Sequence, residues 1–168
     1  MIGSTGESAT AKQLERDAPT MEPLYERDFY TWCMEQARLV QERRFAELDV
    51  ANVVEELESL GKEQAHALRS SYRVLLMHLL KWRFQPDRRS GSWASTIIRE
   101  RANAVERLKE NPGLKPRQGQ LVREAYKVAR RAAAAETGLP LSTFPETCPF
   151  PLAKALDDSL VAYRMNGE

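Results

Sequence analysis

The longest unbroken helical period in the sequence runs through residues 49–82, and it constrains the fold more than any other feature. Successive helical residues lie about 100° apart, which gathers one continuous apolar stripe on this stretch. The stripe comprises Val50, Val53, Val54, Leu57, Leu60, Gly61, Gln64, Leu68, Ser71, Tyr72, Leu75, His78, Leu79 and Trp82. Two further leucines, at 76 and 80, widen it. We therefore expect the second half to lie deep among other helices and the Glu-rich first half to be a one-sided surface helix.

Shorter helical patterns flank this stretch, and no strand-like alternation competes with them. They predict an all-α fold: a single helical bundle of four main helices, at about residues 22–44, 49–84, 92–110 and 116–137. Asp49 is placed to cap the second helix and Gly138 to end the fourth. Prolines crowd the residues that follow, which predicts an extended C-terminal segment wrapped over the bundle and then a short last helix.

The fourth helix has one face of small residues and one of cations. We expect the small face to pack closely on another helix and the cationic face to meet solvent. The small face holds Ala125, Ala129 and Ala132, and the cationic face holds Arg123, Lys127, Arg130 and Arg131.

Length and composition suit one domain, since 168 residues with 42% hydrophobic content can bury a sizeable core. Residues 1–20 hold almost no large apolar side chain and predict a mobile tail, which leaves residues 21–165 as the domain. No apolar run approaches the roughly 20 residues of a bilayer span, and the N-terminus does not resemble a secretory signal. We therefore expect a cytoplasmic protein without membrane association. Cys33 and Cys148 are too far apart for a CxxC motif, so neither a disulfide framework nor a zinc ribbon is predicted.

The net charge of +1 conceals an uneven distribution. Residues 1–80 hold 9 Lys and Arg against 14 Asp and Glu, residues 81–131 hold 14 against 5, and residues 132–168 hold 2 against 5. A basic part can pair with an acidic part inside the fold, or it can bind a polyanion such as nucleic acid. Both interpretations stay open.

Several enzyme classes are excluded by counting residues. With only His66 and His78, neither a three-histidine metal site nor the paired Glu-x-x-His motifs of a di-iron bundle can form. The one such motif, Glu63-Gln-Ala-His66, lies on the side of its helix away from the stripe and predicts a solvated face. No Gly-rich phosphate loop, GxSxG or HExxH occurs. We predict no catalytic residue, no metal and no cofactor.

Three polar residues fall against apolar helix faces. His78 lies at the edge of the stripe, where it is either a core histidine bonded to a nearby acceptor or a ligand in a pocket. Arg101 falls in the middle of the apolar face of the third helix, so a carboxylate must be near, and we expect it to be Glu56. A structural ion pair is the simpler interpretation. The alternative is a small-ligand or metal-dependent enzyme built on Glu56, His78 and Arg101.

The loop at residues 81–93 mixes cations with aromatic rings, a composition that can stack bases and contact phosphates. The same residues can simply close the end of the bundle, with the cations extending over the rings into water. The ligand-binding candidates here are Lys81, Trp82, Arg88, Arg89 and Trp93.

The combination of several runs is specific: LYERDFYTWCMEQARLV, ELDVANVVEELESLG, VLLMHLLKWRFQP, a Ser-Trp pair, ETGLP and FPETCPF. In this order they resemble the bacterial domain-of-unknown-function family number twenty-nine, over about residues 24–157. The resemblance implies an all-helical bundle and no reaction. Its recurrent polar and aromatic positions correspond to Glu55, Glu56, His78, Lys81, Trp82, Trp93 and Arg101.

Together these features predict a protein-interaction or regulatory binding module with a protein partner. Polyanion binding through residues 81–131 is the first alternative, and the Glu56, His78 and Arg101 enzyme is the second. A homodimer stays open.

Overall fold

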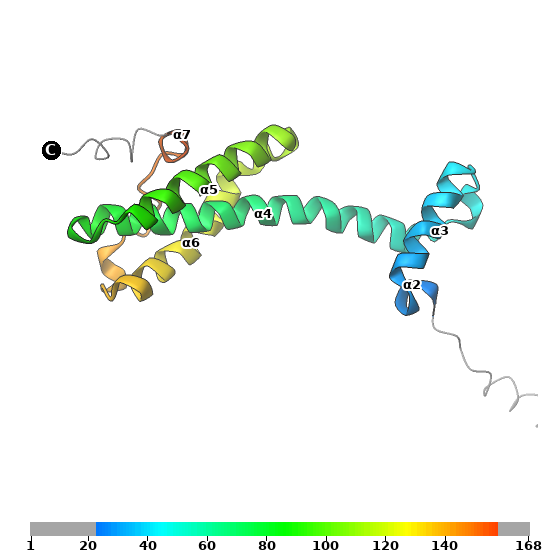
Figure 1. The fold of residues 1–168 in the computed structure, drawn as a ribbon, viewed down its shortest axis with the longest axis horizontal. Coiled ribbons are helices and arrows are strands. Elements are labelled where there is room, and N and C mark those ends of the chain that lie inside the picture. Colours follow the sequence, from blue (N-terminus) through cyan, green and yellow to red (C-terminus); the bar gives the residue numbers. More distant parts are fainter. Residues whose placement is uncertain (1–22, 158–168) are drawn as a thin grey trace, which may run out of the picture. The chain divides into compact units, whose positions relative to one another are not determined.

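The computed structural model describes residues 23–157, and every regular element in that range is a helix (Figure 1). The α-helices are α2 (Leu24–Arg27), α3 (Phe29–Gln41), α4 (Val50–Phe84), α5 (Gly91–Glu110), α6 (Gln118–Thr137) and α7 (Leu152–Ala155). Short 3₁₀ turns lie between them: η1 (Phe45–Glu47), η2 (Pro86–Arg88), η3 (Pro112–Arg117) and η4 (Leu141–Thr143). The all-α bundle class is confirmed. The tail predicted for residues 1–20 lies outside the described residues.

The chain divides into two compact units, Met1–Leu57 and Glu58–Glu168. The described part of the first contains α2, α3, η1 and the opening turns of α4, and the second contains the rest of α4 and all later elements. That residues 21–165 act as one domain stays a prediction.

In the first unit, the helix predicted over residues 22–44 is interrupted, and that expectation is wrong in its continuity. Asp28 separates α2 from α3 with φ −152° and ψ 83°. Its carboxylate accepts hydrogen bonds from the Thr31 amide at 3.0 Å and the Thr31 hydroxyl at 2.5 Å, so it caps α3. The helix then ends at Gln41, because Arg43 adopts φ 59°, in the left-handed region.

The start of α4 is held by Asp49, as predicted. The Asp49 carboxylate accepts from the Asn52 amide at 3.4 Å and from the Trp32 indole at 3.2 Å. Its own amide donates to the Gln36 side chain at 2.9 Å. The Asn52 side chain also donates to the Asp49 carboxylate, at 2.7 Å, and this bond, followed by those from the Asn52 main-chain amide and the Trp32 indole, lowers the pKa of Asp49. Because Trp32 and Gln36 belong to α3, the cap of one helix is fixed by side chains of another.

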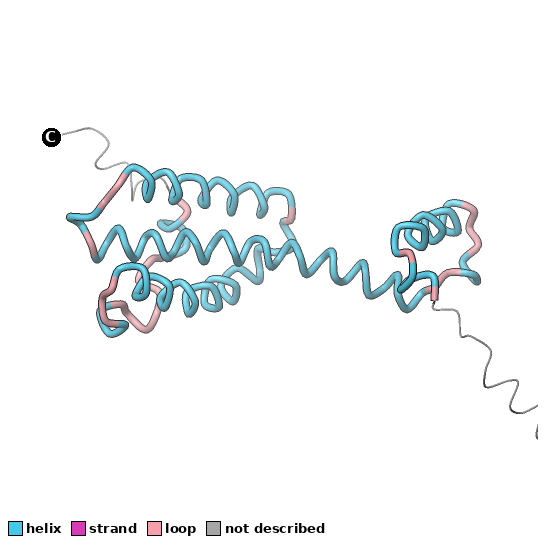
Figure 2. The backbone as a smooth tube through the Cα atoms, turned by 60° about the horizontal axis from the view of Figure 1, so that its bottom comes forward, coloured by secondary structure: helices cyan, strands magenta, loops and turns pink. Residues whose placement is uncertain are grey.

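In the second unit, α5 and α6 flank α4 (Figures 1 and 2). Two ion pairs join α4 to α6: Arg69 with Glu124, and Lys81 with Glu136. Both pairs span the same sequence separation of 55 residues, so α6 runs parallel to α4. The brief turn between α4 and α5 makes α5 antiparallel to both, in an up-down-up arrangement.

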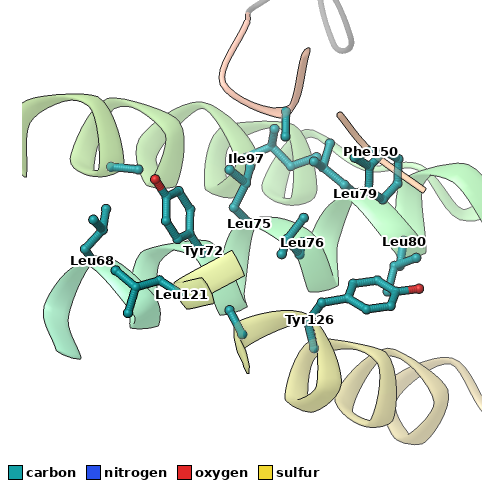
Figure 3. Close-up of a cluster of buried hydrophobic side chains, with 14 of the residues drawn as sticks. Leu68, Tyr72, Leu75, Leu76, Leu79, Leu80, Ile97, Leu121, Tyr126 and Phe150 are labelled. Carbon is teal, nitrogen blue, oxygen red and sulfur yellow. The ribbon is translucent and has the colours of Figure 1, made fainter. Parts of the chain in front are cut away.

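The core of this unit confirms that the second half of α4 lies deep (Figure 3). The buried side chains of α4 occupy a wide arc of the helix surface. Ile97 of α5 and Leu121 and Tyr126 of α6 belong to the same core cluster. The α4 members are Ala65, Leu68, Tyr72, Leu75, Leu76, Leu79 and Leu80. Phe144 and Phe150 of the C-terminal segment complete the core.

The two predicted faces of α6 hold except at Ala132 and Arg130. The small face is buried at Ala125 and Ala129 and half-buried at Ala132. On the cationic face, Arg130 is half-buried rather than exposed. Its guanidinium donates to the carbonyl oxygens of Phe144 at 2.9 Å and Leu141 at 3.2 Å. The exposed cations are Arg123, Lys127 and Arg131.

The wrapped segment predicted after α6 is present. Gly138 ends α6 with φ 71°, and the prolines that follow hold the chain extended apart from η4. The Tyr126 hydroxyl donates to the Pro145 carbonyl at 2.6 Å. Residues 139–151 therefore form a strap whose main-chain oxygens are bonded by side chains of α6.

Replacing Arg43 with Gly should raise the free energy of unfolding by about 0.5–1 kcal/mol. A non-glycine residue in the left-handed region costs about 1–2 kcal/mol, and the greater freedom of glycine in the unfolded chain offsets part of the gain. Gln41→Gly, in the helical last turn of α3, should instead lower stability by about 1 kcal/mol. Urea unfolding followed by circular dichroism measures both. Equal losses in the two variants would contradict a strained Arg43.

Removing the hydroxyls of Tyr72 and Tyr126 should have opposite consequences. Both rings are buried, and burial raises the pKa of each phenol to about 12. The Tyr72 hydroxyl has no hydrogen-bond partner among the described residues, whereas that of Tyr126 bonds Pro145. Tyr72→Phe should leave stability unchanged or raise it by up to about 1 kcal/mol, and Tyr126→Phe should cost about 0.5–1.5 kcal/mol. The reverse order in urea unfolding would refute this.

Candidate functional site

Glu56 is bonded within the first unit. Its carboxylate accepts a 2.5 Å hydrogen bond from the Tyr25 hydroxyl of α2. That bond, with lesser contributions from burial and nearby carboxylates, raises the pKa of Tyr25 to about 12. Tyr25 was not among the predicted site residues, although its spacing from Trp32 on the same helical pattern could have indicated that both face α4.

His78 has the simpler of its two predicted environments. The ring is half-buried, and its Nδ1 lies 2.9 Å from the Val74 carbonyl oxygen, one turn earlier in α4. Since a carbonyl only accepts, Nδ1 carries the proton in this arrangement, which leaves Nε2 as an acceptor. The histidine is thus held by its own helix.

Arg101 is 2% exposed, as its place on the apolar face of α5 predicted. The Arg101 Nε donates to the Ala155 carbonyl of α7 at 2.8 Å. The bond expected between Arg101 and Glu56 stays a prediction. The C-terminal segment approaches α5 at this point, which the sequence pattern of α5 alone cannot reveal. Glu56, His78 and Arg101 thus have different hydrogen-bond partners, and their gathering around one site stays a prediction.

The turn between α4 and α5 does bring predicted residues together. Lys81 is buried, and its ammonium lies 2.5 Å from Glu136 and 4.5 Å from the centre of the Trp93 ring. A buried ammonium needs such a partner, because losing water is costly for a charge. Glu136, the partner from α6, was not predicted. Lys81 thus joins all three long helices of the unit.

The neighbouring pair is Arg89 and Trp82. The Arg89 guanidinium stands 5.1 Å from the Trp82 ring centre, and its Nε donates to the Trp82 carbonyl at 2.8 Å. Arg88 is exposed. Beside this pair is a pocket of about 440 Å³, lined by Trp82, Pro86, Arg89, Ser90, Gly91, Ala94, Ser95 and Ile98. It is mostly apolar and open, and Ser90, which caps α5 by accepting from the Trp93 amide at 3.4 Å, forms part of its rim.

A second cavity lies where none was predicted, in the groove between α4 and α6. It measures about 400 Å³ and is lined by His66, Arg69, Ser70 and Arg73 of α4 and by Glu124, Ala125 and Val128 of α6. The sequence pattern predicts a solvated face at His66, because it contains no information on the helix that packs beside it. Its spacing of three, four and seven residues from 69, 70 and 73 was the available signal, since such residues share one side of a helix.

One family model, described as Domain of unknown function DUF29, matches residues 24–161. The chain belongs to this family. Neither a curated protein nor a solved structure matches the chain.

Family membership assigns no chemistry to these positions, because the DUF29 description carries none. Across residues 23–157 of this DUF29 chain, no group of three His, Cys, Asp or Glu side chains is placed to hold a metal ion. Within the same range, no helix combines the length and apolar character that crossing a bilayer requires.

Whether Arg101 pairs with Glu56 can be tested by a double-mutant cycle. Arg101→Met should cost about 1.5–3 kcal/mol, because it removes a buried charged donor from the Ala155 carbonyl. Glu56→Leu should add to it within about 0.5 kcal/mol, because Glu56 bonds Tyr25 whereas Arg101 bonds Ala155. The measurement is urea unfolding of both single variants and the double variant. Recovery of most of the Arg101→Met loss in the double variant would restore the predicted pair.

Proposed function

We propose that this DUF29 protein is a protein-interaction module whose first unit supplies the contact surface. One observation carries the proposal. Thirteen large apolar side chains of the described residues are exposed, and eight of them fall within residues 23–57, which are 35 of the 135 described residues. The eight are Phe29, Tyr30, Met34, Val40, Phe45, Val50, Val54 and Leu57. Apolar exposure concentrated in this way is typical of a surface that binds another protein.

The types of residue on α3 support a protein partner. Trp32 and Leu39 occupy its buried side, so the ring of Tyr30 and the side chain of Met34 lie on the opposite side, one turn apart. Phe29 and Phe45 are exposed nearby in the chain. Aromatic residues and methionine are enriched in the centres of protein interfaces, and the rigid ring of tyrosine buries a large area at little cost in conformational entropy.

The opening turns of α4 add a second apolar row. Val50, Val54 and Leu57 are spaced at i, i+4 and i+7, which places them along one side of the helix, and each is more than 45% exposed. This is the spacing with which amphipathic helices recognise one another. The apolar stripe that is buried in the second half of α4 is thus exposed in the first unit.

Charge indicates the kind of partner. Residues 23–57 hold eight carboxylates and four arginines. Arg38 and Arg44 form ion pairs with Glu35, Glu42 and Glu47, which leaves five carboxylates of this unit with no ion pair within residues 23–157. Asp28, Asp49 and Glu56 of these five accept hydrogen bonds, and the other two are Glu26 and Glu55. An apolar helix flanked by Lys and Arg complements this surface.

The two other predicted functions have less support. The enzyme hypothesis required Glu56, His78 and Arg101 around one pocket, and each has a different neighbour. The polyanion hypothesis relied on the basic residues 81–131, and in the loop at 81–93 Lys81 and Arg89 are occupied by Glu136 and by Trp82.

Replacing Val54 with Lys should abolish capture of the partner, because it sets a charge in the apolar row. Val105→Lys is the matched control: the two valines are 49% and 48% exposed, and both lie on long helices. The measurement is quantitative mass spectrometry of proteins captured from the native cell by wild type and by each variant. A partner kept by wild type and Val105→Lys but reduced about 10-fold or more by Val54→Lys supports the proposal.

Three outcomes would contradict it. Equal retention by both variants, or equal loss, removes the first unit as the contact surface. A concentration-dependent dimer in light scattering that is lost in Val54→Lys identifies a second copy of the chain as the occupant and overturns the basic partner.

A further inference from the structure

The groove between α4 and α6 is lined by more basic side chains than acidic ones. His66, Arg69 and Arg73 line its α4 side, and Glu124 is the one carboxylate among its lining residues. The Glu124 carboxylate is already bonded, to Arg69 at 3.3 Å and to the Gln120 amide at 2.9 Å, and both bonds lower its pKa. Arg73, which is exposed to solvent, therefore faces the cavity with no ion pair among the described residues.

The rim of the groove extends the same charge. Lys127 and Arg131 follow Glu124 and Val128 by three residues each, so helical geometry places them beside these lining residues on α6. Both are exposed and form no ion pair within residues 23–157. The surrounding chain is basic as well, since residues 58–157 contain 18 Lys and Arg against 10 Asp and Glu. The positive potential of this surface therefore attracts an anion to the groove before direct contacts form.

The lining also determines the size and type of the ligand. About 400 Å³ is within the range of small-molecule sites. Guanidinium groups donate in pairs to phosphate oxygens, and the Ser70 hydroxyl adds a donor between them. The lining contains no aromatic ring on which a nucleic acid base could stack, whereas Ala125 and Val128 supply an apolar wall.

We propose that the α4–α6 groove is a binding site for a small phosphate-bearing ligand, with Arg73 as the main contact and Arg69, Ser70 and His66 as supporting donors. Bound phosphate oxygens compete with Glu124 for the Arg69 guanidinium. The site lies wholly in the second unit, and it does not depend on the protein partner proposed for the first.

The two histidines of the chain provide a direct test. His66 lines the groove, while His78 is bonded to the Val74 carbonyl and is absent from the lining. Titrating the full chain with inorganic pyrophosphate at fixed pH and ionic strength should shift the imidazole NMR signal of His66 along a saturating curve and leave that of His78 in place. His66→Gln assigns the signals. A linear drift of both signals, or no shift at millimolar pyrophosphate, overturns the site.

Variants that remove either a positive or a negative charge distinguish a specific binding site from nonspecific attraction to the basic surface. Arg73→Gln should weaken pyrophosphate about 10-fold or more, as expected for the loss of a charge-assisted bond. Arg123→Gln, which removes the same charge from an exposed α6 position outside the lining, should change the affinity less than about 2-fold. Glu124→Gln should tighten binding because it removes the competing carboxylate. Equal weakening by Arg73→Gln and Arg123→Gln, or weaker binding in Glu124→Gln, overturns the proposal.

A second experiment distinguishes a small phosphate-bearing ligand from the phosphates of a nucleic acid. Single-stranded oligothymidylate, matched to pyrophosphate in phosphate concentration, should bind no more tightly than pyrophosphate and should depend on Arg73 in the same way. Much tighter oligonucleotide binding that depends equally on Arg73 and Arg123 would assign the basic surface to nucleic acid and overturn a small-ligand groove.

Discussion

The second unit depends on the need to bury a helix that is apolar over a wide arc. Between residues 68 and 80, the leucines and the tyrosine of α4 span about 140° of its circumference at about 100° per residue, and burying each such side chain contributes about 1.5–3 kcal/mol. One neighbouring helix cannot cover such an arc. The short turn to α5 and the longer return through η3 to α6 place a helix on either side, and Phe144 and Phe150 cover what remains. The ion pairs of Lys81 and Arg69 then fix the register of a packing that apolar contacts alone leave less specific.

The sequence was informative wherever a local pattern decides the structure. The apolar period predicted the buried half of α4, Asp49 and Gly138 marked helix ends through their own preferred geometry, and the prolines predicted the strap. The break at Asp28 was also local, since an aspartate three residues before a threonine amide is a capping signal, but the continuous apolar pattern around it concealed the interruption.

Partners brought by distant segments could not be predicted from helix faces. Arg101 was correctly predicted to be buried, yet its acceptor is a main-chain oxygen of α7, and any residue type at that position would present the same atom. Glu56 is bonded by Tyr25 of α2, and His78 by the Val74 carbonyl of its own helix, and the apolar stripe of α4 indicated neither partner. The groove of His66, Arg69 and Arg73 was missed for the opposite reason. A polar helix side resembles a solvated surface until the second helix is beside it.

The strap has a consequence for how this chain can change over time. Its acceptors for Tyr126 and Arg130 are carbonyl oxygens, as is the acceptor that α7 offers to Arg101. Substitution of a strap side chain leaves those oxygens in place, whereas substitution of the donor removes the bond. The position of the strap is therefore determined mainly by side chains of the helices. Drift within the strap, away from its two buried phenylalanines and its prolines, should be tolerated more readily than drift at three donor positions distant from it in sequence.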